Sequence, residues 1–224
     1  GNTVAIGAGG NKANGAGSGH VRVYNYNGTS WYQKGADIDG EAAGDYSGYS
    51  VSLSSDGKII AIGAVANYGN GSRSGHTRIY NFNGISWVQL GADIDGEAAG
   101  DQSGYSVSLS SDGKIVAIGA FTNDGKSGDS GHVRVYQFSN DSWSQLGSDI
   151  DGEVANDYSG SSVSLSSDGT TLAIGAYGND GNGVDSGHVR VYNYNGTDWS
   201  LLGEDIDGEA TNDYSGRSVS LSSD

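Results

Sequence analysis

The sequence predicts an all-β fold built from four copies of one four-stranded unit, and three observations lead to this prediction. The stretch DIDGEAAGD and its close copies recur every 56 residues, and four such periods account for all 224 residues. Single histidines and tryptophans keep the same period, starting at His20 and Trp31. Within each unit the apolar residues follow strand patterns and not helical ones. A period above 50 residues without a helical pattern is typical of propellers and β-arrays.

The second unit is the first complete one, and its first half predicts a hairpin. Residues 50–54 (SVSLS) alternate between apolar and polar side chains, which indicates a half-buried strand, here called strand A. Residues 55–57 (SDG) form a tight turn. Residues 58–64 (KIIAIGA) are short and almost wholly apolar, so we expect a strand B that is buried on both faces.

The second half of the unit predicts another pair of strands. Residues 65–75 are rich in Gly, Asn and Ser and indicate a loop. Residues 76–82 (HTRIYNF) are expected to form strand C, and the Asn83–Gly84 pair favours a hairpin turn. Residues 87–94 (WVQLGADI) are expected to form strand D. The stretch DIDGEAAGD then leads into the next unit.

Four antiparallel strands make one blade of a β-propeller, and the sequence predicts that four blades form the chain. Packing the blades around a ring covers both faces of each sheet and protects the strand edges; an open array of small sheets is the alternative. We expect residues 1–224 to form a single propeller domain, with repeats at about 1–46, 47–102, 103–158 and 159–214.

The two ends of the sequence suggest how the ring closes. Residues 3–8 (TVAIGA) repeat strand B, whereas residues 218–222 (SVSLS) repeat strand A. We therefore expect residues 215–224 to complete the first blade within a monomeric four-bladed ring. Half of an eight-bladed ring made by a homo-oligomer, and a fragment of a larger propeller, are the alternatives.

The repeat resembles the FG-GAP repeat of integrin-like β-propellers. The residues that carry the resemblance are SGYSVSLSSDGKIVAIGA (103–120), SGHVRVY (130–136) and SWSQLG (142–147), in which Ser-Gly stands for the FG step and Ile-Gly-Ala for the GAP step. The sequence departs from the family in its A–B hairpin, where a short SSDG turn replaces the calcium loop, and in its four units, since the family usually has seven blades. The resemblance implies a binding module of adhesion type, at the cell surface or outside the cell.

The charge is concentrated in one repeated segment. The chain has 27 acidic and 11 basic residues and a net charge of −16, which argues against nucleic acid as a partner. Sixteen of the acids lie in what we call the acidic stretches, residues 37–45, 93–101, 149–157 and 205–213. The expected strand directions place the acidic stretches beside the B–C loops at one end of the blades. We expect this end to be the working face.

Each acidic stretch carries carboxylates at its positions 1, 3, 5 and 9, and calcium prefers six to eight oxygen ligands. The candidate calcium ligands are Asp37, Asp39, Glu41, Asp45, Asp93, Asp95, Glu97, Asp101, Asp149, Asp151, Glu153, Asp157, Asp205, Asp207, Glu209 and Asp213. The alternative is a structural role, in which Arg78 of strand C pairs with an aspartate and Asp101 caps the turn into strand A.

Two further sets of repeated residues have a structural and a functional interpretation. His76, Arg78 and Tyr80 share one face of strand C, and we expect the histidine to be a buried hydrogen-bond partner and not a metal ligand. The tryptophan that begins strand D, Trp87 in the second unit, is expected to pack between blades; stacking against a sugar is the alternative.

No catalytic arrangement stands out in the sequence. No nucleophile lies beside an evident base and no phosphate-binding loop is present, so we predict no catalytic residues, no organic cofactor and no enzyme. No apolar run is long enough to span a membrane. The B–C loops vary most among the four units, and we predict that they contact a protein or glycan ligand. A purely structural or designed ring and a glycan-binding lectin are the alternatives.

Overall fold

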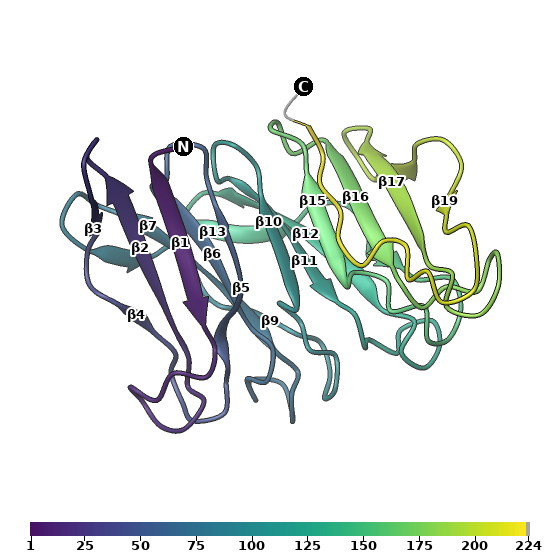
Figure 1. Cartoon of the computed structure of the whole chain (residues 1–224), viewed down its shortest axis with the longest axis horizontal. Coiled ribbons are helices and arrows are strands. Elements are labelled where there is room, and N and C mark those ends of the chain that lie inside the picture. The colour runs from purple at the N-terminus through teal and green to yellow at the C-terminus, as the bar shows by residue number, and fades with distance from the viewer. Residues whose placement is uncertain (223–224) are drawn as a thin grey trace.

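The computed structural model describes residues 1–222 of the 224 and contains strands but no helix in that range (Figure 1). The strands form four separate antiparallel sheets that follow one another along the chain. No helix that could cross a membrane occurs in the described part. The all-β propeller-like architecture predicted from the sequence is thus confirmed.

Each sheet is one blade. The first contains β1 (Thr3–Ala8), β2 (His20–Tyr26), β3 (Trp31–Gln33) and β4 (Ile38–Asp39). The second contains β5 (Ser47–Leu53), β6 (Ile59–Ala64), β7 (His76–Phe82), β8 (Trp87–Gln89) and β9 (Ile94–Asp95). The third contains β10 (Ser106–Leu109), β11 (Ile115–Ala120), β12 (His132–Ser139), β13 (Ser142–Gln145) and β14 (Ile150–Asp151). The fourth contains β15 (Ser162–Leu165), β16 (Thr171–Ala176), β17 (His188–Tyr194), β18 (Trp199–Leu201) and β19 (Ile206–Asp207).

The strand order within a blade follows the sequence order, A-B-C-D, as expected. Strand B of the second, third and fourth blades is buried along almost its whole length, as its apolar composition predicts, whereas β1 of the first blade is partly exposed. Strand D differs from the prediction because it is interrupted: β8 and β9 both pair with β7 and are separated by residues 90–93. Gly91 within this break has a φ of 75°, a left-handed conformation that an ordinary strand residue does not adopt.

The hydrophobic core lies between the blades, and we call each such interface a seam. In the seam between the second and third blades, Ala61, Ile79 and Ile94 of one sheet pack against side chains of β10 and β11, among them Leu109 and Ile118. The other two seams are built in the same way. Each blade therefore depends on its neighbour to bury a face, which is the packing that a propeller requires.

The glycines of the Ser-Gly and Ile-Gly-Ala steps allow neighbouring blades to approach closely. A Cβ atom on Gly63 of β6 would collide with the backbone carbonyl of Gly104, which precedes strand A of the next blade. A Cβ atom on Gly119 would collide in the same way with the backbone carbonyl of Gly160. The two glycine positions of the repeat are therefore two sides of one backbone contact across the seam.

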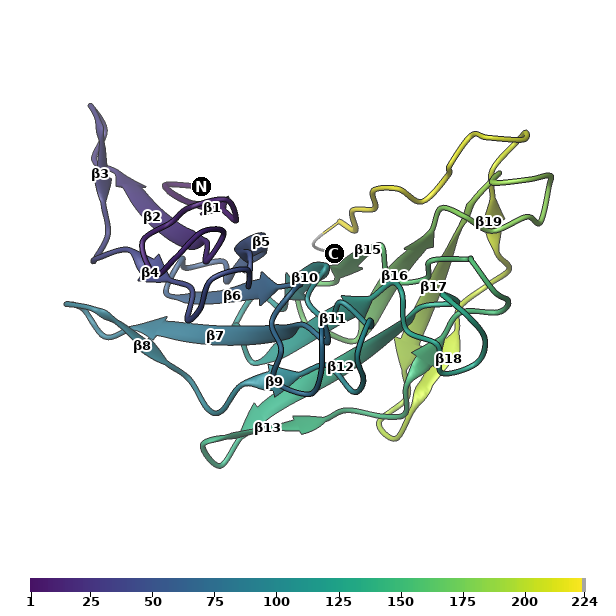
Figure 2. The same cartoon turned by 90° about the horizontal axis from the view of Figure 1, so that it is seen from below.

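The predicted closure of the ring by residues 215–224 is wrong for the described residues, because the four blades form an open arc (Figure 2). The first sheet contains only β1 to β4, and residues 218–222 belong to no strand. The backbone N–H of Leu221 instead donates to Ser164 Oγ of β15 at 3.0 Å. The segment thus lies against the fourth blade and does not reach β1; residues 223–224 lie outside the described range.

Candidate functional site

Each seam contains a network of charged residues that links two blades. In the second blade, Arg78 of β7 donates from Nε and Nη2 to the two carboxylate oxygens of Asp93, both at 2.9 Å. Gln89 donates to the same carboxylate at 2.6 Å. Arg78 also forms an ion pair with Glu41, which comes from the acidic stretch of the preceding blade. One guanidinium therefore binds carboxylates on both sides of the seam.

The network controls the ionisation of its members. Burial favours the neutral form of Asp93, but hydrogen bonds from Arg78 and Gln89 outweigh it and lower the pKa of Asp93 below its ordinary value. His76 is only 3% exposed, and burial followed by the charge of Arg78 lowers the pKa of its imidazole. The burial of His76 is as predicted from the sequence, and its lowered pKa favours the neutral imidazole.

The equivalent residues of the other blades meet at the other seams. Each set brings a histidine of strand C together with two carboxylates, and the ligand atoms within a set lie within 4.8 Å of one another. The sets are Glu41, His76 and Asp93; Glu97, His132 and Asp149; and Glu153, His188 and Asp205. The first blade holds His20, Asp37 and Asp39 without a glutamate from another blade. By composition and spacing, these clusters could hold a metal ion.

The four carboxylates of one acidic stretch do not converge on one point. Asp101 is 3% exposed and accepts a hydrogen bond from the backbone N–H of Ala98 at 2.8 Å, so it caps the turn before strand A. Asp93 is bound by arginine on its own blade, whereas Glu97 reaches Arg134 of the following blade. Each cluster combines two carboxylates with an imidazole, and arginine pairs with the carboxylates, so the side chains of a cluster supply fewer oxygens than the six to eight that calcium prefers.

The tryptophans that begin strand D pack across the seams, as predicted. Trp87 Nε1 donates to the backbone carbonyl of Lys34 in the preceding blade at 2.8 Å. Trp143 and Trp199 donate in the same way to Leu90 and Leu146, at 2.7 and 2.8 Å. The indole ring of Trp87 also packs against the apolar core of its seam.

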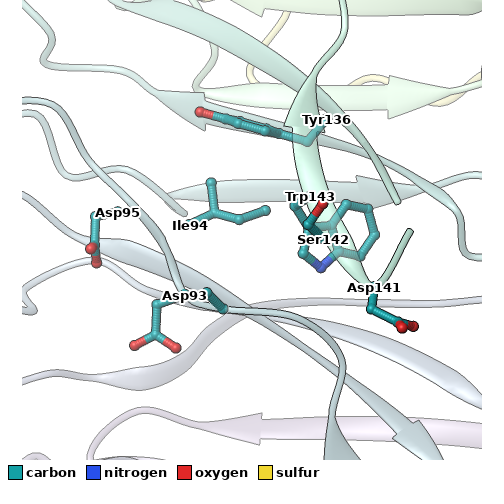
Figure 3. A pocket seen from close by; sticks show the side chains of 8 residues that line it. Asp93, Ile94, Asp95, Tyr136, Asp141, Ser142 and Trp143 are labelled. Atoms are coloured by element: carbon teal, nitrogen blue, oxygen red, sulfur yellow. The ribbon is translucent and has the colours of Figure 1, made fainter. Parts of the chain in front are cut away.

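A hollow of about 300 Å³ opens beside the second seam (Figure 3). Tyr136 and Trp143 supply its aromatic walls, and Asp93, Asp95 and Asp141 lie at its rim. A similar hollow of about 220 Å³ is lined by Asp37, Asp39, Tyr80 and Trp87 at the first seam. Of the aspartates at position 1 of the acidic stretches, Asp37, Asp93 and Asp205 accept hydrogen bonds from arginine, whereas Asp149 accepts one from Gln145.

A second candidate site was not found by sequence reasoning. It is a row of aromatic rings that crosses three blades, and we call it the aromatic patch. Successive ring centroids along the row are 5.0, 4.0, 5.8, 5.2 and 6.3 Å apart. The residues of the aromatic patch are, in spatial order, Tyr49, Tyr105, Phe121, Tyr158, Tyr177 and Tyr214. All lie where strand B ends or strand A begins, which is the end of the blades expected to be the working face.

The aromatic patch continues into a hollow at its first end. This hollow of about 250 Å³ is lined by Tyr46 and Tyr49 together with Arg73 and Gln102. Tyr46 is 44% exposed and Tyr49 is 51% exposed. At the other end, the Arg217 guanidinium lies 5.8 Å from the ring centroid of Tyr177. The surface therefore combines exposed aromatic rings with two arginines.

Part of the aromatic patch rests on strained backbone. Tyr46, Tyr158 and Tyr214 have φ values of 54°, 56° and 53°, the left-handed region that glycine and asparagine adopt at lower cost. Such strain costs on the order of 1 kcal/mol or more per residue and often occurs at functional sites. Gln102 has a φ of 53° at the same position of the repeat, so this conformation belongs to the repeat and not to the tyrosine side chains.

The signal that could have revealed the aromatic patch is variation at three positions of the repeat. The position of Tyr49 holds Tyr, Tyr, Ser and Arg in successive units, and that of Val65 holds Val, Phe and Tyr. The position of Tyr46 holds Tyr, Gln, Tyr and Tyr. Each position lies next to a glycine-containing step of the repeat. The position of Val65 begins the variable B–C loop, whereas the positions of Tyr46 and Tyr49 lie outside that loop, beside the start of strand A.

Comparisons with known proteins support the fold. The sequence profile of a family described as FG-GAP repeat matches residues 37–80 and 150–192. No curated protein matches the chain as a sequence relative. Among solved structures, the hydrazine synthase of Kuenenia stuttgartiensis has a TM-score of 0.61 at 14% identity over 100% of this chain. A proposed 6-phosphogluconolactonase from Bacteroides fragilis has a TM-score of 0.57 at 12% identity over 86% of this chain.

A third similar structure is Sqt1 of Chaetomium thermophilum bound to the N-terminus of the ribosomal protein L10, with a TM-score of 0.57 at 16% identity over 95% of this chain. The chain spans 63%, 50% and 47% of the lengths of these three neighbours, in the order given. At these identities the similarities show the fold alone.

The comparisons contradict the prediction that the chain is not an enzyme, because two of the structural neighbours that share the fold are a hydrazine synthase and a proposed lactonase. The fold thus does not exclude catalysis, although these neighbours assign no reaction to the present chain. The family match covers less than half of the chain, so it shows that residues 37–80 and 150–192 are similar to FG-GAP repeats, and the four sheets together with the structural neighbours show a β-propeller-like fold.

Proposed function

We propose that the chain is a protein-binding module and that the aromatic patch is its binding surface. The observation that carries the proposal is the unbroken row of ring contacts across three blades, at the end of the propeller where the B–C loops lie. Tyr49 and Tyr214 are exposed, and the other four rings are half-buried. Tyrosine and arginine are enriched in protein interfaces because they combine a large apolar contact area with polar groups at the tip.

A protein ligand is favoured over a glycan by the arrangement of the rings. Four of the five ring pairs along the aromatic patch are tilted by 34° to 60°, and only Tyr158 and Tyr177 are stacked, at 17°. The rings therefore form an uneven surface and not a flat platform for a sugar. Sqt1, which shares the fold, is seen bound to an N-terminal segment of another protein, and we propose a comparable peptide-binding mode here.

The proposal can be tested with a displayed random peptide library selected on the whole chain. Peptides that bind should lose at least tenfold in affinity, about 1.4 kcal/mol, for the double variant Tyr49→Ser, Tyr105→Ser. Serine is the residue that the fourth unit itself carries at this position, as Ser161, so the scaffold accepts it. Tyr68→Ser is the matched control, because Tyr68 is 59% exposed but has no ring contact with the aromatic patch.

Two outcomes would contradict the proposal. Peptides that bind the double variant as well as the original chain would remove the aromatic patch as the binding surface. Binding to a glycan array that is lost in the same variant, without peptide binding, would reassign the surface to sugars. Calorimetric titration of the selected peptides or glycans gives the affinities.

Calcium binding by the sixteen residues of the acidic stretches stays a prediction. The density of carboxylates and the match to FG-GAP repeats support it, whereas the arginine in each seam already supplies the positive charge that the carboxylates need. We also propose an extracellular or cell-surface location and an adhesion-type role, with the family match as their support.

A further inference from the structure

The second seam differs from the first and the third in the position of its arginine. At the first seam, Arg78 donates to both carboxylate oxygens of Asp93 and also pairs with Glu41 of the preceding blade. The arginine of the third seam pairs with an aspartate and a glutamate in the same way. At each of these two seams a guanidinium therefore neutralises both carboxylates of the cluster.

At the second seam, Arg134 leaves one carboxylate without a cation. Its Nη2 donates to the backbone carbonyl of Asp95 at 2.8 Å, and its Nη1 lies 3.4 Å from Oε1 of Glu97. Among residues 1–222 no arginine pairs with Asp149, whose Oδ1 accepts a hydrogen bond from Gln145 at 2.6 Å. Oδ2 of Asp149 and Oε2 of Glu97 are thus available to a cation from outside the chain.

The imidazole of His132 faces these two oxygens. Its Nδ1 lies 3.8 Å from Oε2 of Glu97 and 3.9 Å from Oδ2 of Asp149, and both separations exceed hydrogen-bonding distance. The side chain of His132 is only 2% exposed, yet it makes no hydrogen bond within residues 1–222. A buried polar group without a partner is uncommon and indicates a place for a bound ion or water.

The surroundings of His132 keep it in the form that binds metals. Burial, followed by the charge of Arg134, lowers the pKa of the imidazole, which favours the neutral ring. A neutral ring nitrogen is a ligand for transition metals. The side chains of Glu97 and Asp149 are 45% and 34% exposed, so they leave the site open to solvent on one side.

We propose that the second seam binds one divalent transition-metal ion of the zinc type, held by Nδ1 of His132, Oε2 of Glu97 and Oδ2 of Asp149. These three atoms lie within 4.8 Å of one another. Zinc bonds of about 2.0–2.2 Å place tetrahedral ligands about 3.3–3.5 Å apart, so inward movements of the two exposed carboxylates complete the site, with water as the fourth ligand. The nitrogen ligand separates this site from a calcium site, which is built from oxygens.

The ion would join two blades at the place where the other seams use a guanidinium. Glu97 belongs to the acidic stretch of the second blade, whereas His132 of β12 and Asp149 belong to the third. The arginines of the first and third seams would repel an ion in the equivalent clusters, so we expect one ion per chain. A ligand that binds only the folded chain stabilises it, and zinc should therefore raise the melting temperature.

Calorimetric titration of the metal-free, untagged chain with zinc chloride tests the proposal. Glu97→Gln and Asp149→Asn should each weaken zinc binding by at least about tenfold, because disturbing the surroundings of a metal already has an effect of that order. Glu153→Gln and Asp205→Asn are the matched controls, since they change the equivalent, arginine-paired carboxylates of the third seam and should leave the affinity unchanged. Circular dichroism checks that each variant keeps its sheet content.

Thermal melting and competition give two further measurements. Zinc should raise the melting temperature of the original chain and of Glu153→Gln but not that of Glu97→Gln. An excess of calcium should not displace the zinc, because the imidazole nitrogen is a poor calcium ligand. The proposal would be overturned by a lack of zinc binding, by equal binding at several seams, by an unchanged affinity in Glu97→Gln, or by displacement with calcium.

Discussion

The seams and the aromatic patch lie on the same blades but differ in how much their residues vary among the four units. The position of Arg78 is arginine in all four units, and the positions of His76 and Trp87 are equally constant. The positions of Tyr46 and Tyr49 hold several residue types, with an aromatic bias. The constant residues are buried or bonded across a seam, whereas the variable ones are exposed or half-exposed.

The difference indicates which residues carry the architecture and which are free to specialise. A seam residue has a partner from the neighbouring blade, so changing it alone leaves a cavity or an unpaired polar group. A residue of the aromatic patch contacts mainly other exposed rings, so the scaffold tolerates its replacement. The comparison predicts large losses of stability for seam variants and small ones for variants of the aromatic patch.

The largest effect is expected for Trp143→Ala at the second seam. The variant removes an indole from the core and its hydrogen bond to Leu90, and it should lower the free energy of unfolding by about 3–5 kcal/mol. Trp143→Phe keeps most of the packing and should lose about 1–2 kcal/mol. Chemical denaturation followed by circular dichroism measures both. A loss below about 1 kcal/mol for the alanine variant would show that the ring is not part of the core.

A slightly smaller loss is expected for Gly119→Ala. The new Cβ would collide with the backbone carbonyl of Gly160 across the third seam, and a backbone atom cannot move aside as a side chain can. We expect a loss of about 3 kcal/mol, at the upper end of the usual range for overpacking. Gly128→Ala in the B–C loop of the same blade is the matched control, since nothing lies within 4 Å of its Cβ position. Equal melting temperatures for the two variants would contradict the close approach of the blades.

Acid should weaken the seams before it affects the rest of the molecule. Burial and a neighbouring arginine lower the pKa values of His76, His132 and His188 in the folded chain. As the pH falls through the ordinary histidine value, the unfolded chain takes up protons first, so the free energy of unfolding decreases between pH 7 and 5.5. His132→Gln should make this decrease smaller. An unchanged pH dependence in this variant would show that the buried imidazole does not contribute to it.

Substitutions in the aromatic patch should change the free energy of unfolding only slightly. Tyr105→Ser is expected to change the free energy of unfolding by less than about 1 kcal/mol, because Tyr105 is half-buried and Ser161 occupies the same position in the next unit. Calorimetric melting checks this value. A loss comparable with that of Trp143→Ala would mean that the ring row is a structural element, and the contrast with the seams would fail.

The smallest effect is expected from calcium. Since Arg78 and its counterparts already pair with the carboxylates, millimolar calcium should raise the melting temperature no more than sodium chloride at the same ionic strength. A larger rise with calcium, reduced in the variant Asp93→Asn, Asp95→Asn, would instead favour calcium sites in the acidic stretches.

The sequence predicted the strands well because each has a local pattern. The apolar run 58–64 and the hairpin turn at Asn83–Gly84 required no knowledge of the neighbouring blade. The pairing of Arg78 with an aspartate of strand D and the cap by Asp101 were also among the predicted alternatives. These contacts lie within one blade, where strand register places the side chains together.

Apart from the packing of the tryptophans, the contacts across seams could not be predicted in the same way. The partnership of Arg78 with Glu41 depends on how far one blade rotates against the next, and no pattern within one unit specifies that rotation. The aromatic patch and the open arc depend on the same rotation. Closure by residues 218–222 was a sensible expectation from the repeat, but the segment packs against β15 along the arc, far from β1 (Figure 2).

The tryptophan bonds across the seams have a consequence for spectroscopy. The emission of an indole shifts to longer wavelength when water surrounds it. Trp87, Trp143 and Trp199 each sit in one seam with the ring N–H held by a carbonyl, whereas Trp31 is half in water. The chain therefore carries one intrinsic fluorophore at each internal interface. Variants that keep one tryptophan and carry phenylalanine in place of the others would report on one blade pair at a time. The emission wavelength of the remaining indole would then follow the opening of that pair.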